Sequence, residues 1–151
     1  MLETAVGELV ESRRLVVASP DTSVLDAARQ MRVSHVGAVL VVRGEQLVGI
    51  FTERDALNRV MAEGRDPAAT RLAEVMTHDP KTVAADETLG YALLVMHEHG
   101  FRHLPVLEKR RPVGVISARH ALDPDLEDFT AEAERRRKIR RHAAGTRPSR
   151  A

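Results

Sequence analysis

The spacing of apolar residues in the first half of the chain predicts a series of short strands and helices. Residues 36–42 form a continuous, largely β-branched run, which is typical of a strand buried on both faces. After a turn at residues 43–46, a second strand is expected at residues 47–51. Residues 53–62 then predict a helix whose inner side carries Ala56, Leu57, Val60 and Met61.

Further elements precede these two strands. Residues 4–12 have the pattern of a short amphipathic helix, and residues 15–18 are a brief β-rich run. Apolar residues at helical spacing from Val24 to Met31 predict another helix, which Asp21 or Thr22 caps. The first half therefore predicts the order strand, helix, strand, strand, helix.

The same order recurs 65 positions further along the chain. Without a gap, this shift places Asp21 on Asp86, Met31 on Met96, Gly49 on Gly114 and Arg54 on Arg119. Most substitutions between the copies preserve the kind of residue, so residues 17–57 and 82–122 are an internal repeat. Each unit of such a repeat covers the apolar face that its copy leaves open.

The repeat sets the expected domain organisation. A first repeat unit at residues 4–62 is followed by a linker with Gly and Pro at 63–70 and by a second repeat unit at 71–122. A short helix at Leu72–Met76 opens the second unit. A helix at 123–142 and a disordered tail at 143–151 are expected to follow.

Composition narrows the class of protein. Apolar residues make up 43% and charged residues 30% of the 151 positions, as in ordinary globular proteins. Aromatic residues make up only 3%, so the core is expected to be aliphatic. The absence of cysteine excludes disulfides and thiolate metal sites. The longest apolar run is too short to span a bilayer and the first ten residues lack a signal-peptide layout, so we expect a cytoplasmic protein.

Charge is distributed unevenly along the chain. Residues 135–151 hold eight Lys or Arg and no acidic residue, whereas the first 134 residues carry 15 basic and 22 acidic residues. The expected globular part is therefore acidic and its C-terminal tail is basic. Such a tail is either a solvated helix end or a contact for nucleic acid or another acidic partner. Sequence-specific nucleic-acid binding is not expected, because the tail has no aromatic residue and no reader motif.

One strand-to-helix corner, residues 49–55, carries candidate binding chemistry. Thr52 stands at the expected N-cap and Asp55 at the third helical position. A carboxylate accepts two sugar hydroxyls, and a hydroxyl beside a helix N-terminus suits a phosphate. Both residues could also serve only to begin the helix. The repeat keeps the hydroxyl as Ser117 but puts His120 in place of the carboxylate, so the two corners are not expected to bind alike.

The motifs around this corner resemble a known family. They are Val75-Met76-Thr77 with Pro80 and Thr82-Val83, the strand Phe101-Arg102-His103-Leu104-Pro105-Val106, and the ending Gly49-Ile50-Phe51-Thr52-x-x-Asp55. Over about residues 4–122 the chain is similar to the tandem CBS (cystathionine β-synthase) domain pair, or Bateman module. The resemblance implies an α/β fold of two β-α-β-β-α repeats packed about a pseudo-two-fold axis. It also implies a homodimer that senses energy state or metabolites and is not an enzyme.

The resemblance further implies two clefts for AMP, ADP or ATP, and less often for S-adenosylmethionine or NAD. In the first cleft, Asp55 would bind the ribose and Thr52 the α-phosphate, while Ile50 and Arg54 would flank the base and ribose. The second copy would supply the facing wall from six residues: Pro80, Lys81, Thr82, Phe101, Arg102 and His103. This cleft keeps every expected group, so we predict one nucleotide site per chain.

The second cleft departs from the family pattern. Ser117 keeps the hydroxyl, but His120 cannot chelate a pair of hydroxyls as a carboxylate does. The facing wall would be Val16, Val17, Val36, Gly37 and Ala38, which supply no cation for a phosphate. An empty or structural cleft is the preferred interpretation, and a ligand without phosphate is the alternative.

The remaining histidine and serine residues do not indicate a metal site or a catalytic site. His97 and His99 diverge on a helix that Gly100 is expected to end before His103, so a solvated helix terminus is favoured over a metal site. Ser117 and His120 lack an orienting carboxylate, so nucleophilic catalysis is not supported. The sequence therefore leaves two hypotheses for the function. One is a nucleotide-binding regulatory module, and the other is a ligand-free dimerisation or scaffold protein whose basic tail contacts a partner or nucleic acid.

Overall fold

Two sheets, one from each repeat, form the centre of the fold. We describe them from a computed structural model, of which residues 2–10, 14–121, 135 and 138–139 are described. The chain divides into two compact units, Met1–Ala118 and Arg119–Ala151, and each is considered by itself. The α/β fold predicted from the repeat is confirmed.

Apart from β4, which joins the first sheet, the helices and strands of the two repeats follow the same order. The first half contains α1 (Val6–Leu9), β1 (Val17–Ala18), α2 (Val24–Ser34), β2 (Ala38–Arg43), β3 (Gln46–Thr52), α3 (Glu53–Asp55) and the π-helix η2 (Ala56–Met61). The second half contains α4 (Leu72–Val75), β4 (Thr77–His78), β5 (Val83–Ala84), α5 (Leu89–His99), β6 (His103–Glu108), β7 (Arg111–Ser117) and the 3₁₀ turn η3 (Ala118–Ala121).

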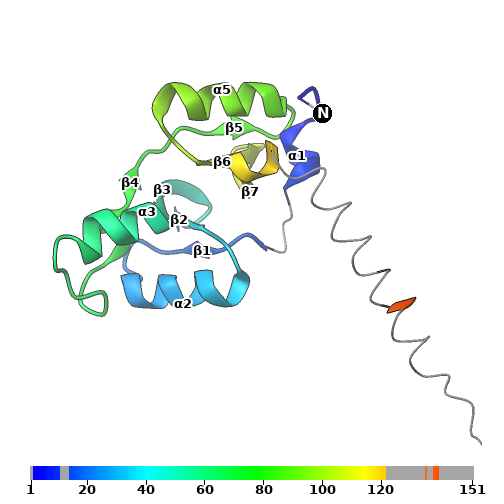
Figure 1. Ribbon diagram of the computed structural model, residues 1–151. Helices are drawn as coiled ribbons and strands as arrows, with labels where there is room; N and C mark the ends of the chain where they lie inside the picture. Colours follow the sequence, from blue (N-terminus) through cyan, green and yellow to red (C-terminus); the bar gives the residue numbers. More distant parts are fainter. Residues whose placement is uncertain (1, 11–13, 122–134, 136–137, 140–151) are drawn as a thin grey trace, which may run out of the picture. The chain divides into compact units, whose positions relative to one another are not determined.

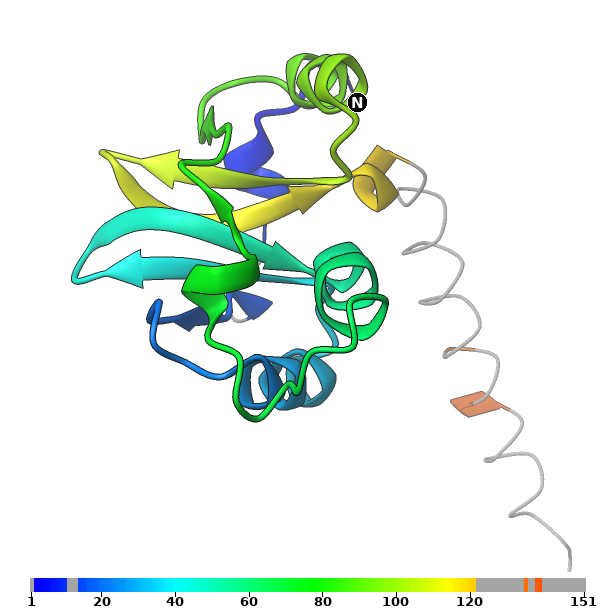
Figure 2. The ribbon, with the colours of Figure 1, turned by 90° about the vertical axis from the view of Figure 1, so that its left-hand side faces the viewer.

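Strand pairing repeats between the copies. In each sheet a short first strand pairs in parallel with the second strand, and the second pairs antiparallel with the third. The first sheet has the order β1-β2-β3-β4, and its last strand comes from beyond the linker. The second sheet has the order β5-β6-β7. Figure 2 shows the hairpin β2–β3 lying beside the hairpin β6–β7, with α2 and α5 on opposite outer sides.

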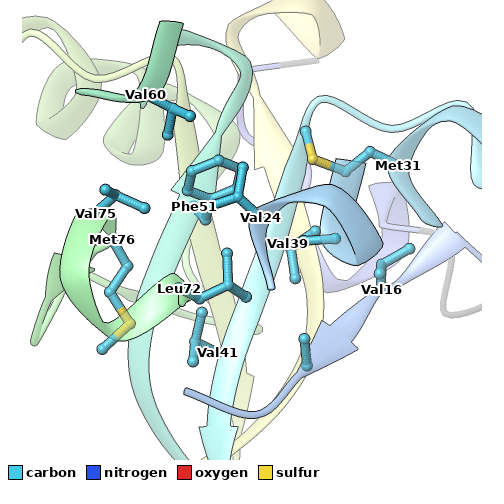
Figure 3. Packing of buried hydrophobic residues seen from close by; sticks show 12 residues of the cluster. Val16, Val24, Met31, Val39, Val41, Phe51, Val60, Leu72, Val75 and Met76 are labelled. Carbon is cyan, nitrogen blue, oxygen red and sulfur yellow. The ribbon is translucent and has the colours of Figure 1, made fainter. Parts of the chain in front are cut away.

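Each sheet has its own apolar core. One core lies between the first sheet and α2, where Phe51, Val39 and Val41 are fully buried (Figure 3). A second core joins β6 and β7 to α5. A smaller cluster of Ala38, Leu40 and Ile50 contacts Val115 of β7, and therefore connects the two sheets. The expected aliphatic core is confirmed, with Phe51 as the only aromatic among the fully buried side chains of the described residues.

The short helix ahead of each repeat packs on the other repeat. The Val6 N–H of α1 donates to Glu87 O at 2.8 Å, and the Leu72 N–H of α4 donates to Thr22 O at 2.9 Å. Val6 belongs to the core of the second sheet and Leu72 to that of the first. Figure 1 shows α1 close to β6 and β7 although it opens the chain. This exchange ties the two halves of the first unit together.

Two glycines at equivalent strand positions make room for this exchange. A Cβ on Gly49 would lie 3.0 Å from both Cε and Cγ of Met76, and a Cβ on Gly114 would lie 2.6 Å from Cβ of Val10. Met76 and Val10 each follow the exchanged helix directly. Close approach of the helix therefore requires glycine at both positions.

Two local predictions were wrong. Ser23 caps α2 by accepting from Asp26 N–H, so neither Asp21 nor Thr22 is its cap, and Thr88 caps α5 in the same way by accepting from Tyr91 N–H. A hydroxyl competes well for this position because it reaches the third N–H of the helix. Gly100 ends α5 with φ of 70°, as predicted.

The second error concerns the buried side of the helix predicted at residues 53–62. Its inner side does not include Leu57 and Met61, which are 56% and 74% exposed, while Val60 is buried. The helix also changes from α to π geometry after Asp55. Because a π-helix turns less per residue, the 3.6-residue spacing assigned these side chains to the wrong face.

The predicted C-terminal elements lie almost entirely outside the described residues. Arg135, Lys138 and Ile139 are helical. The rest of the helix expected at 123–142 and the tail expected at 143–151 stay predictions.

Candidate functional site

Thr52 and Asp55 form a complete capping box at the end of β3. The Thr52 N–H donates to Asp55 Oδ2 at 2.9 Å, the Thr52 hydroxyl donates to the same oxygen at 3.2 Å, and the Asp55 N–H donates to Thr52 Oγ1 at 3.4 Å. The structural role considered for these residues is therefore confirmed. Oδ1 takes no part in the box, and a carboxylate oxygen can accept more than one hydrogen bond, so the box is compatible with ligand binding.

Arg59 holds the other oxygen of Asp55. Its Nε lies 3.6 Å from Asp55 Oδ1, and its Nη1 donates to Val75 O at 3.2 Å and Met76 O at 3.0 Å. These two carbonyls are at the C-terminal end of α4, where a helix leaves acceptors unpaired. Arg59 is not among the residues predicted from the sequence, although its i, i+4 spacing from Asp55 is a signal that could have identified it. The repeat offers Pro124 at the equivalent position.

The segment at the start of β6 reaches the corner from the second repeat. Arg54 Nη1 donates to Gly100 O at 3.1 Å. A Cβ on Gly37 would lie 2.7 Å from Glu53 Oε1 and 3.1 Å from His103 Nε2, so both side chains border the same space beside Gly37. His103 of the second repeat and Glu53 of the corner thus both lie close to Gly37, and the role of His103 in binding stays a prediction.

The other residues predicted for the first cleft differ in how far they are exposed. Ile50 is 6% exposed and lies in the cluster between the sheets. Phe101 is half-buried and its ring stacks on that of His99, with centroids 5.6 Å apart. Arg102, Lys81 and Thr82 are exposed and Pro80 is half-buried. Pro80, Lys81 and Thr82 connect β4 of the first sheet to β5 of the second, and their role in binding stays a prediction.

The residues predicted for the second cleft are only partly assembled within one unit. Val16 and Ala38 are buried, whereas Val17 is 45% exposed. Ser117 ends β7 opposite His103, and Val36 and Gly37 are half-buried. His120 belongs to the second unit, so its predicted place in this cleft stays untested. The helix that begins after Ser117 is a 3₁₀ turn, whereas the one after Thr52 is α-helical.

An apolar groove lies between α2 and η2. It has a volume of about 360 Å³ and is lined by eight residues: Ala28, Met31, Arg32, Val36, Glu53, Ala56, Leu57 and Met61. Leu57 and Met61 on its rim are among the exposed large apolar side chains of the described residues. Exposed apolar surface of this kind is typical of interaction sites.

The histidines expected at a helix terminus do lie there. His99 Nδ1 is 3.1 Å from Val95 O, and His97 is exposed on the last turn of α5. Among the residues that the structure describes, no group of three potential metal ligands is found. Within the same residues, no helix has the length and apolar content needed to cross a membrane. The cytoplasmic location stays a prediction.

Comparisons with known proteins agree with this architecture. A family model for the CBS domain matches residues 6–62 and 72–125. The chain is 32% identical over 120 residues to the mitochondrial CBS domain-containing protein CBSX3 of Arabidopsis thaliana, a match that covers 76% of this chain and 58% of that protein. Another curated relative, CBSCBSPB1 of the same plant, is 36% identical over 115 residues and is covered over 21% of its length. The chain thus spans about three fifths or less of these relatives.

Solved structures show the same fold. A protein with CBS domains from Burkholderia ambifaria MC40-6 is 32% identical, with a TM-score of 0.75, and the match covers 83% of this chain and 96% of that one. A CBS domain protein from Pyrobaculum aerophilum complexed with AMP is 25% identical, with a TM-score of 0.71, and the match covers 78% and 89% of the two chains. The chain belongs to the CBS domain family and carries the domain as a tandem pair.

Proposed function

We propose that the chain is a regulatory module that binds one adenine nucleotide at the Thr52–Asp55 corner. The observation that carries the proposal is the capping box at the end of β3, beside the segment of residues 100–103 from the second repeat. The AMP complex of the Pyrobaculum aerophilum relative supports an adenosine ligand. Asp55 binds the ribose and Thr52 the phosphate in this proposal, and the module has no catalytic role.

The two corners differ in the side chains that bind a ribose. Hydrogen bonds to charged groups contribute about 1.5–3 kcal/mol each, so a corner without a carboxylate binds ribose much more weakly. Position 120 is His, and position 124 is Pro where the first corner has Arg59. One strong nucleotide site per chain follows from this difference.

Thermal shift with a panel of ligands tests the proposal. At 100 times Kd, a ligand stabilises the native state by about 2.7 kcal/mol, which raises Tm by about 5–10 °C for a chain of this size. AMP, ADP, ATP, S-adenosylmethionine and NAD should each be added at millimolar concentration. We expect at least one to raise Tm, and no shift from any of them would refute the proposal.

Two variants distinguish the corners. Asp55→Asn keeps an acceptor for the capping box but removes the charge, so it should abolish the ligand-dependent shift while the ligand-free protein still unfolds cooperatively. His120→Ala should leave the shift unchanged. Loss of the shift in His120→Ala alone would show that the two corners have been assigned the wrong way round.

The module also pairs with a second copy in this proposal. The exposed apolar rim of Leu57 and Met61 beside the groove supports such pairing. The alternative function, a ligand-free scaffold whose basic tail contacts a partner or nucleic acid, rests on the eight basic residues at 135–151. Deleting these residues should weaken partner binding in a salt-dependent manner if the alternative holds.

A further inference from the structure

An acidic side chain stands beside the proposed phosphate position. Glu53 directly follows Thr52, and its N–H donates to Gly37 O at 3.1 Å. Its Oε1 lies 2.7 Å from the point at which a Cβ on Gly37 would stand, and His103 Nε2 lies 3.1 Å from that point. Glu53 is thus next to Thr52 in the chain, and its carboxylate borders the same space beside Gly37 as the histidine of the facing wall.

Gly37 is required here for space. Its φ is not among the positive values of the described residues, so the backbone conformation does not call for glycine. Any side chain at position 37 would occupy the space that the carboxylate and the imidazole both border. The glycine thus permits an acid and a histidine from opposite repeats to lie close to the same point of the backbone.

The second repeat serves as an internal comparison. The same backbone bond recurs there, because Ala118 N–H donates to Arg102 O at 2.9 Å. The 65-residue shift places Glu53 on Ala118, Gly37 on Arg102 and Ala38 on His103. The backbone frame is therefore common to both corners, while an acid and a histidine stand at these positions only at the corner that has Asp55. A feature needed only for folding of the frame would be expected in both copies.

We infer that Glu53 sets the ligand class of the site by limiting the negative charge that the ligand carries beyond the ribose. This inference rests on the proposed nucleotide-binding function. A carboxylate near a phosphate raises the free energy of the complex with each added negative charge, because like charges repel and the repulsion is strongest at short range, where salt screens it least.

Several charged groups besides Glu53 lie around the corner. Arg54 donates to Gly100 O, and Asp55 faces Arg59. Lys81 and Arg102, the exposed cations of the predicted facing wall, attract a phosphate, and Glu53 opposes them. Because of this opposition, the favoured ligands in this inference are adenosine compounds with at most one phosphate, or with a positive charge such as a sulfonium. ADP and ATP bind more weakly.

Calorimetric titrations of the full chain with adenosine, AMP, ADP and ATP test this order. EDTA should be present so that no divalent cation offsets the phosphate charge. For the natural sequence we expect ATP to bind at least ten times more weakly than AMP. In Glu53→Gln, ATP should gain about ten-fold or more in affinity, while adenosine changes less than two-fold. The selective gain separates a charge effect from a change in the fold.

Glu45→Gln is the matched control. It removes the same charge from the turn before β3, at the far end of that strand from Thr52, about 20 Å away at the rise of an extended chain. This variant should leave the ratio of AMP to ATP affinity unchanged. An unchanged ratio in Glu53→Gln, or an equal change in Glu45→Gln, would overturn the inference and leave the proposed function intact. If none of the four ligands binds the natural sequence but S-adenosylmethionine does, the preference for low charge is supported. If nothing binds, the proposed function and the inference both fail.

Discussion

The strand glycines beside the exchanged helices give a sharp prediction about stability. Replacing Gly114 with Ala would bring the new Cβ to 2.6 Å from Val10 Cβ and 2.7 Å from Val10 Cγ2. Replacing Gly49 with Ala would instead bring the new Cβ against the side chain of Met76, whose Sδ is the nearest atom and makes an even shorter contact, with Cε and Cγ at 3.0 Å. Both contacts are too short, but valine is stiff about χ1, whereas methionine has three rotatable bonds and adapts readily.

Two opposing effects set the expected change in the free energy of unfolding. Overpacking a core costs about 1–3 kcal/mol, and removing a glycine stabilises by about 0.4–1 kcal/mol through the unfolded chain. Since Val10 can move away only with its backbone, we expect Gly114→Ala to lower the free energy of unfolding by about 1–2 kcal/mol. Met76 can change rotamer, so Gly49→Ala should cost about 1 kcal/mol less than Gly114→Ala.

Urea unfolding of both variants at one protein concentration checks this difference, because self-association would otherwise shift apparent stability. A parallel thermal scan should show Tm lowered by about 2–8 °C for Gly114→Ala. If Gly49→Ala costs as much as Gly114→Ala or more, side-chain stiffness does not decide the outcome. If neither substitution has a cost, α1 and α4 do not pack on the opposite sheets as described.

Further predictions concern the helix ends, Arg59 and the apolar rim. His35 ends α2 with φ of 54°, and Gly100 stands at the equivalent position of the second repeat with φ of 70°. His35→Gly should therefore raise the free energy of unfolding by about 1 kcal/mol, and Gly100→Ala should lower it. Urea unfolding measures both changes. Arg59→Met keeps an aliphatic side chain but removes the N–H donors to the carbonyls of α4. Because the Arg59 side chain is half exposed, the free energy of unfolding should fall by only about 1–2 kcal/mol. An unchanged urea midpoint would show that these hydrogen bonds contribute nothing to stability. Met61→Glu should reduce the mass measured by light scattering from a dimer to a monomer without lowering Tm of the ligand-free monomer, and an unchanged mass would exclude this rim from the interface.

The position of Glu53 shows why part of the site escaped prediction. Thr52 and Asp55 were found because a hydroxyl and a carboxylate three residues apart are a local signal. Glu53 gave no such signal, since its meaning depends on Gly37 and His103, which lie in other strands and meet it only in the folded chain. Arg59 does have a local signal, its i, i+4 spacing from Asp55, but its bonds to the carbonyls of α4 depend on the folded chain.

By itself, the sequence determined the repeat, the order of strands and helices and the difference between Asp55 and His120. These features depend on local spacing and on comparison of the chain with itself, so no tertiary information is needed. Only the tertiary structure decided that α1 and α4 exchange partners, because that depends on hydrogen bonds between residues such as Val6 and Glu87. It also decided that Leu57 and Met61 face outward, since the π geometry after Asp55 rotates these side chains away from the core that their spacing predicted.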